Sequence, residues 1–393
     1  MASRDSGPGS LSPHGERVGA RDESPRDSVV VLGAGPAGLA VAACLKQRGR
    51  RCTILEAAEA VGSSWRNHYA RLHLHTVKEH SSLPGLPFEA SEPRYVPRAG
   101  VVDYLERYAS HHGLAPRFGE RVRRLTRAGG GWEVETSVGL HRASDVVVAT
   151  GYNRVPHEPS FEGASSFEGE VIHSRAYRSG EPYRGRRVLV VGLGNTGGEI
   201  ALDLLEHGAK PALSVRSPVN VVPRDFLGTP TQITGLRLSF LPRWAADRIG
   251  RLVSRMAFGN LEPYGIRTPS VGPMSGIYDN RRIPLIDVGT VAAIKRGEIA
   301  VYPNVQALTP TGARFADGRS AELDAIVYAT GYRPGLDELL GDCAAIGSDG
   351  YPRAPTGDVP GLHFVGFSNV STGLLRQIGI DAETVASAIT GAG

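Results

Sequence analysis

A run of apolar, mostly β-branched residues that leads directly into a glycine-rich turn is the feature that most constrains the fold of this chain. Residues 29–32 read Val-Val-Val-Leu and residues 33–38 read Gly-Ala-Gly-Pro-Ala-Gly, followed by a small-residue apolar helix. In a strand–turn–helix unit of this kind, the first glycine permits the turn, the second lets a pyrophosphate approach the backbone and the third allows close helix–strand packing. A second strand at 51–55 ends at Glu56, where a carboxylate can accept the ribose hydroxyls of an adenine dinucleotide.

The same pattern returns in the second half of the chain. An apolar strand at 187–191 leads into a second G-x-G-x-x-G at 192–197, and a helix is expected from Gly198 to about His207. The next strand, at 213–217, ends in Arg216-Ser217 rather than in an acid. Arginine at that place accommodates a 2′-phosphate, so the second copy predicts an NADP site and the first a site for FAD or NAD.

Both halves also close alike, because Ala-Thr-Gly-Tyr stands at 149–152 and again at 329–332, each after an apolar strand. A duplicated order of strand, glycine turn, helix, strand and A-T-G-Y predicts two nucleotide-binding α/β units.

Composition excludes several other classes of protein. The net charge of +4 comes from scattered arginines without a dense basic cluster, which disfavours nucleic-acid binding. No apolar run approaches the ~20 residues that cross a bilayer. Residues 1–27 are rich in Ser, Pro, Gly and mixed charge and are expected to be a disordered tail.

The cysteines and histidines point to no metal or disulfide chemistry. Cys44, Cys52 and Cys343 form no C-x-x-C pair, so a redox-active dithiol is not expected and a reducing, cytoplasmic location fits. His73 and His75 alternate along one short segment, and no Asp or Cys completes a ligand set, so no metal site is predicted.

A further fingerprint lies between the two halves. Residues 167–177 read F-x-G-x-x-x-H-x-x-x-Y just upstream of the second glycine turn. Together with both glycine turns and both A-T-G-Y strands, this resembles class B flavin-dependent monooxygenases. Residues 63–66, 72–75, 82–88 and 284–289 are similar to the plant YUCCA subgroup and its bacterial relatives, whose plant members convert indole-3-pyruvate to indole-3-acetate.

The resemblance implies an α/β fold with two Rossmann-like dinucleotide-binding domains of the three-layer ββα type, one for FAD and one for NADPH. The expected FAD-binding domain is split into residues 28–158 and 333–393, and the expected NADPH-binding domain is inserted between them at 159–332. The oligomeric state stays open, with a homodimer as one option.

The implied activity is an NADPH- and O2-dependent monooxygenation that proceeds through a C4a-(hydro)peroxyflavin, with a small molecule as substrate. The leading expectation is oxidative decarboxylation of an aryl 2-oxo acid such as indole-3-pyruvate. Two alternatives remain: N- or S-oxygenation of a small amine or thioether, and a flavin-dependent NADPH reductase or dehydrogenase without oxygen transfer. The flavin carries the chemistry in such enzymes, so no catalytic side chain is assigned.

The candidate cofactor-binding residues fall into two groups. Those expected at FAD are Gly33, Gly35, Pro36, Ala37, Gly38, Glu56, Ser64, Trp65, His75, Val122, Ala149, Thr150, Gly151 and Leu374. Those expected at NADPH are Gly192, Gly194, Asn195, Thr196, Gly197, Arg216, Ser217, Ala329, Thr330 and Gly331.

Three features have expected roles of a different kind. His75 stands where animal-type relatives have an Asn, so it is not expected to act as the flavin-stabilising amide of those enzymes. His173 and Tyr177 are interpreted as linker residues between the two domains, with a cofactor contact by His173 equally open. The aromatic, Gly/Pro-broken insertion at 226–283 is either a substrate lid or a satellite core, and the core is favoured.

Overall fold

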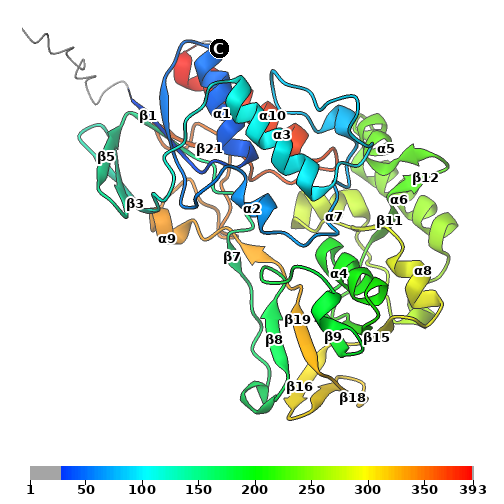
Figure 1. Ribbon diagram of the computed structural model, residues 1–393. Helices are drawn as coiled ribbons and strands as arrows, with labels where there is room; N and C mark the ends of the chain where they lie inside the picture. Colours follow the sequence, from blue (N-terminus) through cyan, green and yellow to red (C-terminus); the bar gives the residue numbers. More distant parts are fainter. Residues whose placement is uncertain (1–27, 392–393) are drawn as a thin grey trace, which may run out of the picture.

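The computed structural model describes residues 28–391, and the tail predicted at 1–27 lies outside the described residues. Two parallel sheets carry the architecture, and Figure 1 shows them in separate parts of the molecule. Each sheet builds one half of the molecule around one glycine turn, and the first sheet takes its last strand from residues 362–364. The α/β fold predicted from the duplicated pattern is therefore confirmed.

The first sheet has four strands in the order β2, β1, β6, β21, all parallel. They are β1 (Val29–Leu32), β2 (Cys52–Leu55), β6 (Asp145–Val148) and β21 (Leu362–Phe364). Every residue of β1 is buried, because the sheet is covered on both faces.

Helices cover one face of this sheet and a small antiparallel sheet covers the other, which gives the expected three layers. The helices are α1 (Pro36–Gln47), α3 (Arg98–His111) and α10 (Leu374–Thr390), and the covering strands are β3 (Val122–Ala128), β4 (Gly131–Thr136) and β5 (Leu140–Ala143). Figure 1 shows α1, α3 and α10 stacked side by side.

The second sheet repeats this plan with five parallel strands in the order β15, β10, β9, β19, β8. They are β8 (Glu170–His173), β9 (Arg187–Val191), β10 (Lys210–Ser214), β15 (Ala300–Tyr302) and β19 (Ala325–Tyr328). One face packs against α4 (Asn195–Glu206) and α8 (Thr290–Lys295), and the other against β16 (Val305–Thr309), β17 (Gly312–Phe315) and β18 (Ser320–Glu322).

Three element boundaries differ from the sequence prediction. The strand predicted at 213–217 is β10, which ends at Ser214, because its pairing with β9 is set by the Lys210 to Arg187 register. Helix α4 begins at Asn195 rather than at Gly198, directly after the glycine turn. The sequence predicts a last helix from Ile378 to Ile389, whereas helix α10 begins at Leu374 after Gly373, whose positive φ of 103° makes the sharp entry.

A short antiparallel pair joins the two halves. Strand β7 (Val155–Pro156) leaves the first half and pairs with β20 (Tyr332–Arg333), which returns to it. Both crossings of the chain therefore run side by side, with β7 shortly after the first A-T-G-Y segment and β20 beginning at the tyrosine of the second.

The insertion after β10 forms helices at the right of the view in Figure 1. Its main elements are α5 (Thr231–Leu238), α6 (Arg243–Phe258) and α7 (Pro273–Asn280), with β11 (Val221–Pro223), β12 (Asp225–Phe226), β13 (Thr229–Pro230) and β14 (Leu285–Asp287) at its ends. The remaining short helices of the described chain are α2 (Ser63–Arg66), α9 (Asp337–Leu340) and the single 3-10 turns Lys78–His80, Ala164–Ser166, Glu181–Tyr183 and Glu262–Tyr264.

The satellite core favoured for this insertion is wrong. Phe240 and Trp244 are 79% and 64% exposed, and only Ala246 and Asp247 of α6 are buried. Phe258 packs instead against the core of the second half. The aromatic residues of the insertion therefore form no common core, and α6 also leaves Leu252 and Met256 exposed.

Candidate functional site

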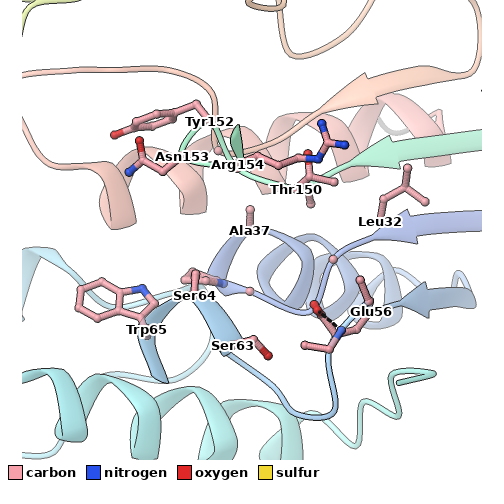
Figure 2. A pocket seen from close by; sticks show the side chains of 18 of the residues that line it. Leu32, Ala37, Glu56, Ser63, Ser64, Trp65, Thr150, Tyr152, Asn153 and Arg154 are labelled. Carbon is pink, nitrogen blue, oxygen red and sulfur yellow. Dashed lines mark hydrogen bonds between the residues drawn. The ribbon is translucent and has the colours of Figure 1, made fainter. Parts of the chain in front are cut away.

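A cleft of about 660 Å³ lies at the carboxyl ends of the first sheet, beside the start of α1. Ligands of open α/β sheets bind at this edge. Figure 2 shows side chains from the ends of β1 and β2, from α2 and from the segment after β6 converging on it. The residues predicted at FAD that line it are Gly33, Gly35, Pro36, Ala37, Glu56, Ser64, Trp65, Val122, Ala149, Thr150, Gly151 and Leu374.

The first glycine turn has the geometry that a close-approaching pyrophosphate requires. Gly33 has a φ of 106°, and a Cβ there would lie 2.8 Å from the Ala149 carbonyl oxygen. A Cβ at Gly38 would lie 1.8 Å from the Gly33 carbonyl oxygen, so Gly38 serves packing and does not line the cleft. A Cβ at Gly35 would meet nothing within 4 Å. The second glycine therefore leaves open space over the N-terminus of α1, where backbone N–H groups attract a phosphate.

Glu56 is oriented by the backbone around the cleft. Its Oε2 accepts a hydrogen bond from the Ala34 N–H at 2.7 Å. Its Oε1 accepts one from the Ala58 N–H at 2.9 Å, drawn as a dashed line in Figure 2. A carboxylate has further lone pairs, so both oxygens can also accept ribose hydroxyls. The pre-set orientation means that binding would cost little side-chain entropy.

One polar group in the cleft lacks a partner within the described chain. The Thr150 Oγ1 is buried and forms no hydrogen bond there, although Thr150 lines the cleft. A buried hydroxyl without a partner costs free energy unless a ligand satisfies it. Open space at Gly35, an oriented carboxylate and an unpaired hydroxyl together fit an adenine dinucleotide.

The second glycine turn repeats the first in detail. Gly192 has a φ of 110° and a virtual Cβ 2.6 Å from the Ala329 carbonyl oxygen, and a Cβ at Gly197 would lie 2.0 Å from the Gly192 carbonyl oxygen. A Cβ at Gly194 would again meet nothing within 4 Å. At Gly331, which has a φ of 86°, the backbone is equally open. The two turns are thus equivalent in shape, although the second does not line the first cleft.

Other residues predicted at NADPH have mixed surroundings. The Asn195 Oδ1 accepts a hydrogen bond from the Ile286 N–H at 2.7 Å, so this amide ties α4 to β14. Thr196 lies beside the buried Tyr69, whose pKa is raised by burial and lowered in part by Thr196. Arg216 is exposed and forms no ion pair among the described residues, which leaves its guanidinium available to a ligand. Thr330 donates its hydroxyl to the His157 carbonyl oxygen.

His75 does not line the cleft, although its neighbours Leu74 and Thr76 do. Its Nε2 contacts the Glu199 carboxylate on α4, and Glu199 is only 3% exposed. His75 therefore joins the loop before α3 to the second half of the chain. No sequence signal marked Glu199 as its partner, because the two residues are far apart in the chain.

The fingerprint residues have structural partners that suit a linker. The His173 Nε2–H donates to the Gly331 carbonyl oxygen at 3.2 Å and the Nδ1 accepts the Arg175 N–H at 3.1 Å, so the ring is neutral in this arrangement. Burial lowers the pKa of His173, which favours the same neutral form. The Tyr177 hydroxyl donates to the Asp203 Oδ2 at 2.6 Å, and burial raises the pKa of Tyr177. Neither group has the surroundings of a proton carrier.

Several residues at the cleft were not predicted. They are Asn67, His68, Tyr152, Asn153, Arg154, Arg175 and Arg178, among others. Tyr152 belongs to the first A-T-G-Y and Arg175 lies inside the 167–177 fingerprint, so those patterns could have indicated both. The positions of Asn67 and His68 follow from the tertiary path of the chain after α2, and no local signal marks them.

Cysteine chemistry is absent from the cleft. All three cysteines are unpaired and none lines it. Burial raises the pKa of Cys44 to about 12 and that of Cys52 to about 11, so both are poor nucleophiles. Within residues 28–391, no group of three His, Cys, Asp or Glu side chains is placed to hold a metal ion, and no helix is long and apolar enough to cross a membrane.

Comparison with known proteins agrees with this geometry. Residues 30–224 match the family model described as pyridine nucleotide-disulphide oxidoreductase. The chain is 40% identical over 353 residues to indole-3-pyruvate monooxygenase YUCCA1 of Oryza sativa subsp. japonica, covering 86% of each protein. It is 38% identical over 349 residues to probable indole-3-pyruvate monooxygenase YUCCA1 of Arabidopsis thaliana, covering 86% of this chain and 84% of the relative.

Solved structures share the fold. A flavin-containing monooxygenase from Stenotrophomonas maltophilia superposes with a TM-score of 0.73 at 24% identity, covering 93% of this chain and 99% of that one. The open structure of cyclohexanone monooxygenase gives a TM-score of 0.72 at 21% identity, covering 93% and 87%. These families imply a flavin and a nicotinamide cofactor, which the two glycine turns suit. By its identity to these relatives over most of its length, the chain belongs to the YUCCA family of flavin-dependent monooxygenases.

Proposed function

We propose that this chain uses FAD and NADPH to convert an aryl 2-oxo acid, such as indole-3-pyruvate, to the carboxylic acid one carbon shorter. The 40% identity to the rice indole-3-pyruvate monooxygenase, over 86% of both proteins, carries this proposal. In the balanced reaction, the oxo acid, O2, NADPH and a proton give the shorter acid, CO2, NADP+ and water.

The proposal divides the chain into two domains. Residues 28–158 and 333–393 would bind FAD, since the first sheet combines β1, β2 and β6 with β21. Residues 159–332 would bind NADPH, since all strands of the second sheet lie within them. The β7–β20 pair spans the boundary.

The chain's own residues would hold the two cofactors. Gly35 and the first turn of α1 would bind the FAD pyrophosphate, and Glu56 would accept the ribose hydroxyls. Gly194 and the start of α4 would bind the NADPH pyrophosphate, and Arg216 the 2′-phosphate. The chemistry that flavin supplies when bound is hydride acceptance from a nicotinamide and activation of O2. The walls of the cleft would exclude water from that chemistry.

A dithiol reductase is disfavoured by the cysteines. Cys44 contacts the Glu383 carboxylate on α10, its thiol has a raised pKa, and it lies toward the C-terminal end of α1, whereas the cleft is lined by the first residues of that helix. Replacing all three cysteines by serine is therefore expected to leave NADPH oxidation unchanged.

Product analysis with the purified protein tests the proposal. Loaded with FAD and given NADPH and O2, the enzyme is offered indole-3-pyruvate, a panel of small amines and a panel of thioethers. Indole-3-acetate formed in step with NADPH oxidation supports the proposal. Formation of N- or S-oxides without decarboxylation would show that the substrates are amines or thioethers and not 2-oxo acids. NADPH oxidation coupled to a separate electron acceptor, with no oxygenated product, would show that the protein is a reductase or dehydrogenase and not a monooxygenase.

A further inference from the structure

A buried amide from the insertion lies behind two of the segments that form walls of the cleft. Gln232 is in the first turn of α5 and is 4% exposed. Its Oε1 accepts a hydrogen bond from the Val77 N–H at 2.8 Å, and its Nε2 donates to the Thr372 carbonyl oxygen at 2.6 Å. The Nε2 also lies 3.5 Å from the His80 carbonyl oxygen. The Gln232 side chain therefore joins α5 to two segments that are distant from it in sequence, residues 77–80 and the loop that contains Thr372.

The two segments that Gln232 joins to α5 both continue into walls of the cleft. Thr76, the neighbour of Val77, lines it, and so does Leu374, the first residue of α10. Gly373 separates Thr372 from that helix, and a Cβ on Gly373 would lie 2.8 Å from the Gln232 Nε2 and 2.9 Å from the Thr76 Cγ2. No free space therefore remains between Gln232, Gly373 and Thr76, so Gln232 cannot move without displacing one of the other two.

The insertion touches the same loop at two further points. The Tyr278 hydroxyl on α7 lies 3.1 Å from the Ser371 Oγ, and Gly235 on α5 approaches the Ser371 carbonyl oxygen so closely that a Cβ would lie 3.3 Å from it. The Tyr278 contact is exposed, whereas the hydrogen bonds of Gln232 to Val77 and Thr372 are buried. Buried hydrogen bonds hold their geometry better than exposed ones, because water cannot replace either partner.

We propose that Gln232 is a positioning residue, which holds the N-terminus of α10 against the Thr76–Val77 loop so that both face the flavin correctly. This inference rests on the proposed function, because it requires a flavin in the cleft. The N-terminus of a helix carries partial positive charge and unpaired N–H groups, which stabilise negative charge on a ligand next to it. The insertion at 226–283 thereby acts on the flavin site through this amide.

The test compares Gln232→Met, which keeps the side-chain length but cannot form the hydrogen bonds, with Thr234→Val as a matched control. The Thr234 Oγ1 lies 3.4 Å from the Pro230 carbonyl oxygen and reaches no cleft segment. We expect the FAD dissociation constant of Gln232→Met to rise about tenfold, since two buried backbone groups lose their partner. H2O2 released per NADPH oxidised should also rise, while KM for NADPH and all values for Thr234→Val stay within about twofold of wild type.

Hydrogen exchange gives a readout that a purely structural role would not move. In the wild-type chain, adding FAD should protect the amides of α5 as well as those of residues 33–38, because Gln232 ties α5 to the cleft walls. In Gln232→Met, the protection of α5 should be lost and that of residues 33–38 kept.

The inference is overturned if Gln232→Met binds FAD as tightly as wild type, or if FAD leaves α5 of the wild-type chain unprotected. The second measurement needs no variant and decides the matter even if Gln232→Met does not fold. A wild-type chain that binds no FAD at all would instead refute the proposed function.

Discussion

Replacing Gly194 by alanine should weaken binding of the nicotinamide nucleotide without affecting folding. The structure leaves room for a methyl group at this position, and that room is where the phosphate is expected to bind. Gly194 has ordinary backbone angles, a φ of −106° and a ψ of −170°, and a Cβ would meet no protein atom within 4 Å. Alanine at a compatible glycine position gains ~0.4–1 kcal/mol of stability. Alanine is a poorer N-cap than glycine, which costs a similar amount, so unfolding is expected to change by less than about 0.5 kcal/mol.

The effect on NADPH should be much larger. The methyl group would occupy the space through which a pyrophosphate reaches the backbone N–H groups of α4. Losing one such charge-assisted hydrogen bond costs about 1.5–3 kcal/mol, which corresponds to roughly 10- to 150-fold in KM for NADPH. FAD affinity should stay unchanged, because Gly194 lies outside the first cleft.

Gly197→Ala is the matched comparison. Its Cβ would lie 2.0 Å from the Gly192 carbonyl oxygen, so the turn or the helix must shift. We expect Gly197→Ala to lose about 1–3 kcal/mol of stability or more. Thermal denaturation followed by circular dichroism, and steady-state NADPH oxidation, measure the two effects. An unchanged KM for NADPH in Gly194→Ala, or a thermal midpoint as low as that of Gly197→Ala, would refute the reasoning.

Three further predictions use other parts of the structure. Glu56→Gln should weaken FAD binding about tenfold and leave KM for NADPH unchanged, because the amide NH2 of glutamine cannot accept a hydrogen bond from the N–H of Ala34 or Ala58. Flavin fluorescence titration measures the affinity, and an affinity equal to that of the wild type would contradict the prediction. Arg216→Gln should raise KM for NADPH at least about tenfold and KM for NADH by much less, which steady-state kinetics with both nucleotides decides. Burial lowers the pKa of His173, so the unfolded chain takes up a proton below about pH 6.5 that the folded chain resists, and stability should fall as pH falls through that range. His173→Gln should flatten this part of the thermal-midpoint profile between pH 7 and pH 5, and an identical slope in both proteins would show that His173 does not contribute.

Local sequence patterns were sufficient to predict the turns whose backbone conformation depends on neighbouring residues. The two glycine turns were predicted from residue type and spacing. The positive φ of Gly33 and Gly192 and the close packing at Gly38 and Gly197 match the turn and packing roles expected of the first and third glycines. Such turns need particular backbone angles and close approaches that glycine alone allows, so the sequence records them directly. The start of α10 was predicted less well, because its entry depends on Gly373 being packed between Thr76 and Gln232.

The insertion shows the opposite case. Its aromatic residues suggested a core, but α6 packs against α7 and β11 with a face that leaves Trp244 exposed, and Phe240 in the preceding turn is exposed as well. The partners of His75 and Gln232 are likewise more than a hundred residues away in sequence. No periodicity or motif encodes a pairing at that distance.

The amino-acid sequence by itself therefore determined the duplicated strand–turn–helix plan, the family and the outline of the two nucleotide sites, because backbone-level requirements leave a signature in neighbouring residues. Tertiary structure alone decided which polar side chains face the cleft and which hold the halves together. Glu56 faces the cleft, whereas His75 is taken by Glu199 and Gln232 spans two walls. The physical reason is that a hydrogen-bond partner is chosen by proximity in the folded chain, and only packing of the core brings such distant groups together.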